Sequence, residues 1–285
     1  MIIYSFFAAL MTAGDLIYEK YLFTISRLKD RQKIFVTAMF LFAALFLAIL
    51  VLVFPSLWSV KDGASDTLFL ALLVSVVVIA SIRNLLYYYS FQREGLCQIE
   101  PFMSFSPLLT VLFAEIIYPG ETNPIVFVLA VIAAVSLVFS KIEKRHLTID
   151  KALIPIVAVV FLEALENNLA RELLRVYSPA AMYMIRSFFV ALTLLAFTRP
   201  KLGKIYRSEA KHLAIISLFW VSVMVSIYYS YQTVGVVYTS LVLMLAPILI
   251  VLGSKFILKE KGSNKKNIVA LAIVSVCVLL AQLVR

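Results

Sequence analysis

Acidic and polar side chains recur at helical spacing inside apolar stretches of this sequence. Two sets follow the i, i+3, i+4 pattern that places residues on one face of a helix: Asp15, Tyr18 and Glu19, and Glu163, Glu166 and Asn167. An ionisable group in hydrocarbon costs roughly 2.5–3.5 kcal/mol on insertion scales, so such groups usually face an interior cavity and mark a pathway. The two sets therefore predict a polar site between membrane-spanning helices.

An aromatic and polar octet, written twice, adds to this predicted site. "YYSFQREG" at 88–95 returns as "YYSYQTVG" at 228–235. Tyrosine faces and amide groups from both copies would wall a central cavity, although tyrosines near helix ends are also typical of membrane interfaces. The predicted substrate-binding residues are Asp15, Tyr18, Glu19, Asn84, Tyr88, Gln92, Glu100, Glu163, Glu166, Asn167, Arg186, Tyr228, Gln232 and Tyr238.

The charges of the predicted cavity favour some solutes over others. Acids outnumber bases among the ionisable residues inside the spans, which suits a cationic or zwitterionic solute beside tyrosine rings. Asp15, Glu163 and Glu166 are candidates for coupling transport to protons, because an acid in a membrane cavity can exchange them. Ion pairs of Asp15 with Lys20 and of Glu166 with Arg171, which would only fix the packing, are the structural alternative.

The composition identifies what must position these residues. The chain is 63% hydrophobic and 15% charged, with a mean hydropathy of +1.00, whereas soluble domains are about half apolar and about a quarter charged. Continuous apolar runs without period-two alternation indicate helices rather than a barrel. Ten membrane spans are predicted, at residues 2–23, 34–54, 67–91, 97–118, 124–140, 152–174, 179–198, 212–233, 236–258 and 266–284.

The spacing of the octets divides the chain into two repeats. Each octet closes a span, the third or the eighth, and Pro107 and Pro247 follow at the same distance in the next span. "SPLLTVLFAEIIYPGE" from Ser106 aligns with "APILIVLGSKFILKEK" from Ala246 in the same 140-residue register. The fold prediction is an all-α polytopic membrane protein, one integral domain of two five-helix repeats at 1–145 and 146–285. An odd number of helices per repeat makes the topology inverted.

These features resemble the drug/metabolite transporter superfamily, specifically its EamA-type ten-helix members. The resemblance rests on the two five-helix halves, the prolines of the fourth and ninth spans, and an acid just past each of those spans, at Glu121 and Glu260. It implies transport of a metabolite by a multi-pass protein of the cell membrane, inner or plasma.

The functional prediction is a secondary transporter that moves a small polar organic solute, such as an amino acid or amine, by alternating access. A flippase or carrier for a lipid-linked or phosphorylated metabolite, such as a nucleotide sugar, is the alternative. An enzyme is not expected, because the sequence has neither HExxH-type metal spacing nor a Ser/His/Asp set with a histidine in a span. No cofactor and no metal are expected. The partners are a solute and the lipid bilayer, and a monomer suffices.

The net charge of +10 indicates the orientation of the protein in the membrane rather than nucleic-acid binding. Most lysines and arginines fall in the connections on one side of the predicted bundle. Basic short loops favour the cytoplasmic side, which would place both termini outside. The family resemblance implies termini in the cytoplasm, so the orientation stays open.

Overall fold

The computed structural model describes residues 3–25, 31–93, 99, 102–103, 105–118, 123–141, 154–253 and 265–284. The chain is all-α over these residues, apart from an isolated antiparallel bridge between Val60 and Tyr177, which confirms the predicted class. The elements are α1 (Ile3–Ile25), α2 (Gln32–Val53), η2 (Pro55–Leu57), α3 (Thr67–Phe91), α5 (Phe105–Ile117), α6 (Pro124–Lys141), α7 (Ile154–Leu173), α8 (Pro179–Thr198), η3 (Leu202–Lys204), α9 (Arg207–Val234), α10 (Val236–Leu243), α11 (Ala246–Gly253) and α12 (Lys265–Val284).

The helices follow the predicted apolar runs closely, and α3 and α8 have the predicted bounds. The ninth predicted span differs, because it divides into α10 and α11 just before Pro247. A proline lacks the N–H that would bond the carbonyl four residues back, and its ring clashes with that carbonyl. The chain tightens there: the N–H of Leu245 donates to the carbonyl of Val242 at 3.0 Å.

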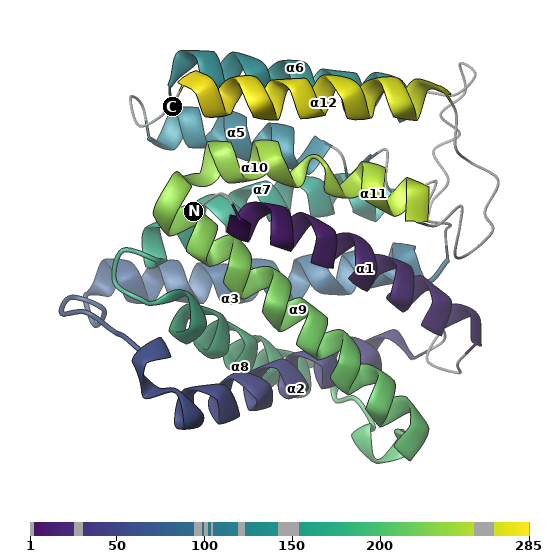
Figure 1. Cartoon of the computed structure of the whole chain (residues 1–285). Helices are drawn as coiled ribbons and strands as arrows, with labels where there is room; N and C mark the ends of the chain where they lie inside the picture. The colour runs from purple at the N-terminus through teal and green to yellow at the C-terminus, as the bar shows by residue number, and fades with distance from the viewer. Residues whose placement is uncertain are drawn as a thin grey trace.

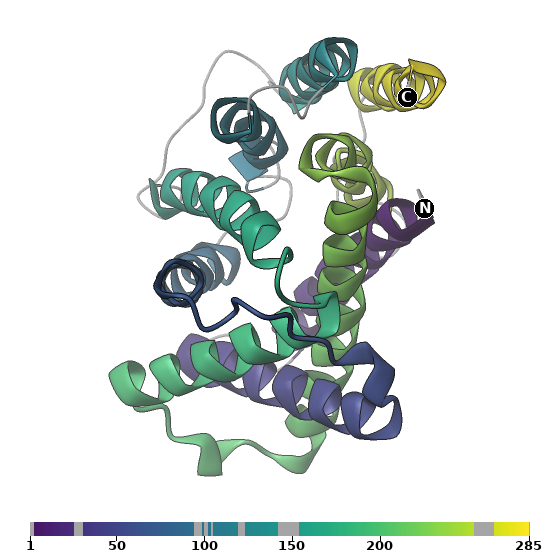
Figure 2. The same cartoon turned by 90° about the vertical axis from the view of Figure 1, so that its left-hand side faces the viewer.

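The helices form a bundle with both chain ends at one end (Figure 1). Figure 2 shows α6 and α12 side by side along one edge, and α2 and α8 together at the opposite edge. Between these pairs stand two walls. One wall contains α3, α7 and α5, and the other contains α9, α1, α10 and α11. The α5–α10 contact joins the two walls.

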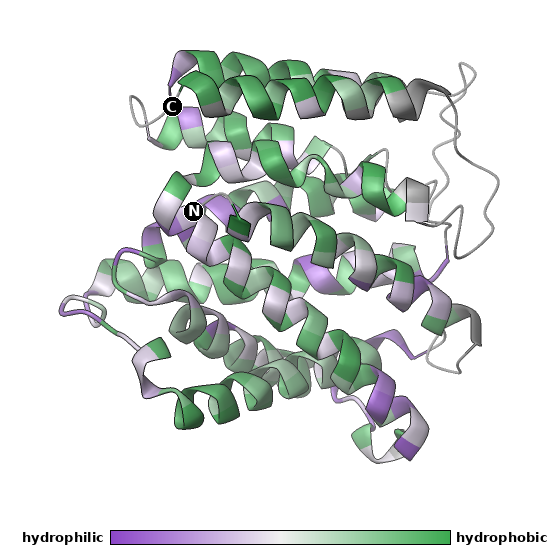
Figure 3. Cartoon of the chain, viewed as in Figure 1, coloured by the Kyte–Doolittle hydropathy of each residue, from purple (hydrophilic) through white to green (hydrophobic). Residues whose placement is uncertain are grey.

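Apolar residues cover the helices along most of their length, while hydrophilic residues gather mainly at the ends and in the connections (Figure 3). Four helices, α2, α3, α8 and α9, are long and apolar enough to cross a membrane by themselves. Large apolar side chains such as Leu52, Phe197 and Leu283 are at least 80% exposed. Exposed apolar surface on this scale marks a membrane or protein interaction surface.

The connections after α2 and after α7 are hydrogen-bonded to each other. The N–H of Lys61 donates to the carbonyl of Val176, and the N–H of Ser178 donates to the carbonyl of Ser59, both at 2.8 Å. The hydroxyl of Ser178 also accepts from the N–H of Ser59 and donates to the carbonyl of Leu57. This interloop bridge joins the first predicted repeat to the second.

Candidate functional site

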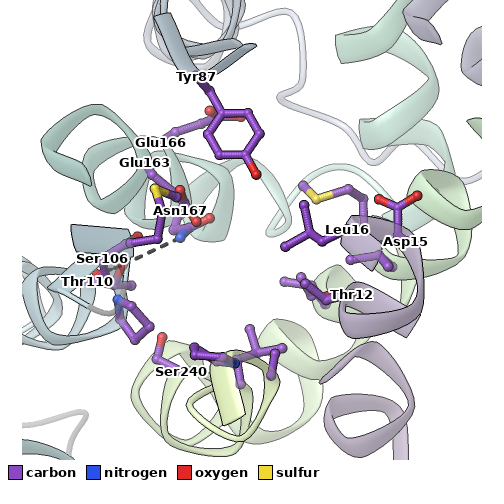
Figure 4. Close-up of a pocket in the computed structure, with 18 of the residues that line it drawn as sticks. Thr12, Asp15, Leu16, Tyr87, Ser106, Thr110, Glu163, Glu166, Asn167 and Ser240 are labelled. Atoms are coloured by element: carbon purple, nitrogen blue, oxygen red, sulfur yellow. Dashed lines mark hydrogen bonds between the residues drawn. The ribbon is translucent and has the colours of Figure 1, made fainter. Parts of the chain in front are cut away.

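A cavity of about 160 Å³ lies between the two walls of the bundle (Figure 4). The helices that line it are those of the two walls, and α2, α6, α8 and α12 contribute no lining residue. The lining residues are Thr12, Asp15, Leu16, Arg83, Asn84, Tyr87, Met103, Ser106, Pro107, Thr110, Glu163, Glu166, Asn167, Trp220, Val223, Met224, Ile227, Tyr231, Ser240, Leu243, Ala246, Pro247 and Ile250.

Most of these lining residues come in pairs that occupy corresponding positions of the two sequence repeats. Seven pairs lie 140 positions apart: 83 and 223, 84 and 224, 87 and 227, 103 and 243, 106 and 246, 107 and 247, and 110 and 250. Three more pairs lie 151 positions apart, between α1 and α7: 12 and 163, 15 and 166, and 16 and 167. Corresponding positions of the two predicted repeats therefore line one cavity.

The wall formed by α3, α5 and α7 is polar and contains a buried ion-pair cluster. Both arginines of the cluster, Arg83 and Arg186, contact Glu166: the Nε of each lies 2.8 Å from one of its carboxylate oxygens. Arg83 also lies 3.5 Å from Glu163. Glu166 and Arg186 are at most 2% exposed. Buried charges need partners of this kind, so the cluster holds α3, α7 and α8 together.

Asp15 faces the same cavity from the opposite wall, on α1 beside Thr12 and Leu16 (Figure 4). It is 2% exposed, and its Oδ1 has no hydrogen-bond partner within the described ranges. Glu166 and Asp15 thus differ in whether a positively charged side chain contacts the carboxylate. The first acid is neutralised by arginines, while the second lines the cavity and forms no ion pair with a described residue.

Glu19 lies one helical turn after Asp15 and is fully buried behind the cavity. Its Oε1 accepts a hydrogen bond from the hydroxyl of Tyr88 at 2.7 Å and one from the indole N–H of Trp220 at 3.1 Å. Trp220 itself lines the cavity. Glu19 therefore fixes the position of this indole ring in the wall.

The structure brings five of the predicted substrate-binding residues into the cavity lining: Asp15, Asn84, Glu163, Glu166 and Asn167. Three others support lining residues or lie next to them: Glu19, Tyr88 and Arg186. Glu100 lies outside the described residues.

The remaining predicted residues lie elsewhere. Tyr18 bonds Nδ1 of His212 at 2.6 Å, Gln92 is buried at the end of α3, and Gln232 donates to the carbonyls of Leu174 and Tyr177. Tyr228 packs against Tyr183 and Tyr231, and Tyr238 lines a second cavity with Arg171.

The tyrosines that line the cavity are not Tyr88 and Tyr228, the octet tyrosines that the sequence predicted. Tyr87 and Tyr231 line the cavity, whereas Tyr88 packs behind it among Phe35 and Phe91. Successive residues of a helix point about 100° apart, so one position decides whether a ring faces the cavity. Of the residues predicted on α3, Asn84 lines the cavity, and its neighbours Arg83 and Tyr87, which were not predicted, line it too.

Arg83 is the main residue that the sequence interpretation left without a role. One signal was present, because an arginine within an apolar run needs an acidic partner or a route to water. Ser106, Thr110 and Ser240 were also missed. Serine and threonine in apolar helices often bond the backbone of their own helix, as the hydroxyl of Thr110 does with the carbonyl of Ser106. Their sequence positions therefore carry little functional signal.

Comparisons with known proteins agree with this architecture. Residues 150–282, which include α7 to α11 and most of α12, match the model of the EamA-like transporter family. A solved structure, described as the crystal structure of a protein, aligns with a TM-score of 0.73 and 14% sequence identity over 99% of this chain and 96% of that one. At this identity the likeness shows the fold alone. The comparison with curated proteins gave no match.

The family match confirms the resemblance predicted from the sequence, and it is consistent with the drug/metabolite transporter superfamily. Together with the apolar helices, it defines the class as an integral, multi-pass membrane protein of the transporter type. The similarity to the EamA-like transporter family covers residues 150–282.

Proposed function

We propose that the protein is a secondary transporter that moves a small polar organic solute by alternating access. Its ten spans would form two inverted five-helix repeats in the cell membrane, at 1–145 and 146–285. The observation that carries this proposal is the paired lining of the cavity, in which ten pairs of corresponding positions face one space. In inverted-repeat transporters the substrate site lies at the repeat interface near the bilayer midplane.

The helix contacts also support two related halves. Exchanging each span for its counterpart turns the α3–α7 contact into the α9–α1 contact, and both contacts are present. The same exchange turns the α5–α7 contact into contacts of α1 with α10 and α11, which are also present. Swapping the two halves therefore leaves the helix contacts nearly unchanged. A bundle of this kind has two forms of similar energy, one open to each side of the membrane. Alternating access requires two such forms.

The size of the cavity favours a small solute over a large one. An engineered cavity of about 150 Å³ holds benzene, and this cavity has a similar volume of about 160 Å³. A small amine or amino acid is of that order. A nucleotide sugar or a lipid-linked carrier is much larger, so the volume gives the flippase alternative no support.

Among the candidates for proton coupling, we favour Asp15. Glu163 and Glu166 both contact Arg83, and Glu166 also contacts Arg186. A carboxylate held by arginine gives up its charge less readily than one without a cation beside it. Asp15 would then take the proton, and Asn84 and Asn167 would supply hydrogen bonds to the solute.

Proteoliposomes containing the purified protein test this function. We expect saturable movement of at least one solute from a panel of amino acids, amines and sugar nucleotides, together with counterflow from preloaded vesicles. A pH gradient should alter the rate for the wild type but not for Asp15→Asn. The rate with Glu172→Gln, outside the cavity, should match the wild type. Movement of no solute in the panel, or a linear dependence on concentration, would contradict carrier function.

A further inference from the structure

The corresponding acids of the two halves have different electrostatic surroundings. Glu166 lies between Arg83 and Arg186. Asp15 occupies the corresponding position on α1, and it forms no ion pair with any residue that the structure describes. Lys20, five residues further along α1, donates instead to the carbonyl of Phe91 at 3.1 Å.

The sequence explains this difference. The position that corresponds to Arg83 in the second half is Val223, and the one that corresponds to Asn84 is Met224. Where the polar wall has Tyr87, the other wall has Ile227. Asp15 therefore faces the cavity from a wall whose other lining residues are mostly apolar.

The charges around the cavity do not balance. Arg83 and Arg186 offset Glu163 and Glu166, which leaves the polar wall neutral. Asp15 adds one negative charge on the far side. The acid nearest to it along α1 is Glu19, one helical turn further on, which bonds Tyr88 and Trp220 rather than a cation.

We propose that Asp15 is the specificity-determining residue of the cavity and selects an organic monocation with an apolar body. The ammonium group would pair with the Asp15 carboxylate, which supplies the partner that a buried charge requires. The apolar body, about the size of one ring, would lie against Val223, Met224 and Ile227. A zwitterion is disfavoured because its carboxylate would approach a wall whose arginines already contact glutamates. This inference rests on the proposed function for the claim that the bound cation is moved.

The chain contains its own reporter for a binding test. Trp220 lines the cavity, and the second of the two tryptophans, Trp58, lies in the connection after α2. In a Trp58→Phe background the tryptophan emission comes from the cavity wall alone. Three probes share one ring and differ in charge: phenethylamine is a monocation, phenylalanine a zwitterion and phenylacetate an anion.

Titration of the purified full chain in detergent micelles should give a saturable change of Trp220 emission with phenethylamine. Phenylalanine should bind about tenfold more weakly or worse, and phenylacetate should give no saturable change. Asp15→Asn should weaken phenethylamine binding by about tenfold or more, because it removes one partner of a buried charge pair. Equal binding of phenethylamine and phenylalanine, no binding of phenethylamine, or unchanged binding by Asp15→Asn would overturn the proposal.

A second variant keeps the carboxylate and supplies the missing partner. Val223→Arg places a guanidinium at the position that corresponds to Arg83, where it would neutralise Asp15. We expect loss of phenethylamine binding from Val223→Arg, whereas Glu172→Gln, outside the cavity, should bind phenethylamine as the wild type does. Circular dichroism checks that each variant is folded. Wild-type affinity in a folded Val223→Arg variant would also overturn the proposal.

Transport assays separate this inference from the proposed function. If phenethylamine binds in an Asp15-dependent way but is not moved in proteoliposomes, the inference stands and the transport function fails. If solutes are moved with no preference for monocations and no dependence on Asp15, the transport function stands and the inference fails.

Discussion

The two walls of the cavity are built on corresponding positions, yet their chemistry differs. The wall of α3, α5 and α7 contains Arg83, Asn84 and Thr110, whereas the corresponding positions of the other wall contain Val223, Met224 and Ile250. The shape of the bundle therefore depends on apolar packing that both walls share. The charged groups can differ between the walls, provided that each buried charge has a partner.

The largest expected effect separates the two acids by their contribution to stability. Glu166→Gln leaves Arg83 and Arg186 without their shared carboxylate, and loss of one partner of a buried ion pair costs about 3–5 kcal/mol. Asp15→Asn breaks no ion pair, so its free energy of unfolding should change by less than about 1 kcal/mol. Thermal unfolding in detergent, followed by circular dichroism, measures both. Equal losses of stability would show that Asp15 is also a packing residue.

The second expected effect compares the tyrosines that open the two octets. The hydroxyl of Tyr88 donates to Glu19, and a hydrogen bond to a charged group contributes about 1.5–3 kcal/mol. The hydroxyl of Tyr228 has no hydrogen-bond partner in the described part of the chain. Tyr88→Phe should therefore lower the unfolding midpoint, while Tyr228→Phe should leave it nearly unchanged. The same unfolding assay distinguishes them, and a larger loss from Tyr228→Phe would contradict this account.

The smallest expected effect concerns the packing of the apolar wall. A Cβ at Gly253 of α11 would overlap Cδ1 of Ile17 on α1, whereas a Cβ at Gly14 would meet Phe219 at an ordinary 3.9 Å. Ile17 can change rotamer, so Gly253→Ala should cost about 1 kcal/mol or less. Gly14→Ala lies within a helix and should stabilise by up to about 1 kcal/mol. A stabilising Gly253→Ala would mean that α1 and α11 pack more loosely than described.

The helices could be predicted from the sequence because long apolar runs end at clear breaks. Asp66 precedes α3, Pro179 begins α8, and Pro247 accounts for the division of the ninth predicted span into α10 and α11. The octets and the register of the prolines predict two repeats, at 1–145 and 146–285. These features depend on local composition and spacing, which a single sequence contains.

The details of the candidate site could be predicted only in part. Spacing placed Asp15, Glu163, Glu166 and Asn167 on common helical faces, but it could not give the rotation of α3. That rotation depends on how Tyr88 packs against other helices. The partners of Glu166 likewise come from α3 and α8, at distances along the chain that no local pattern encodes.

The interloop bridge resists separation of two connections at one end of the bundle. Two backbone hydrogen bonds and those of the Ser178 hydroxyl fasten residues 57–61 to residues 176–178, and each contributes about 0.5–1.5 kcal/mol net. These hydrogen bonds must break before the two loops can separate. The bridge thus opposes opening at this end of the bundle. Its strength would set how often the two connections separate.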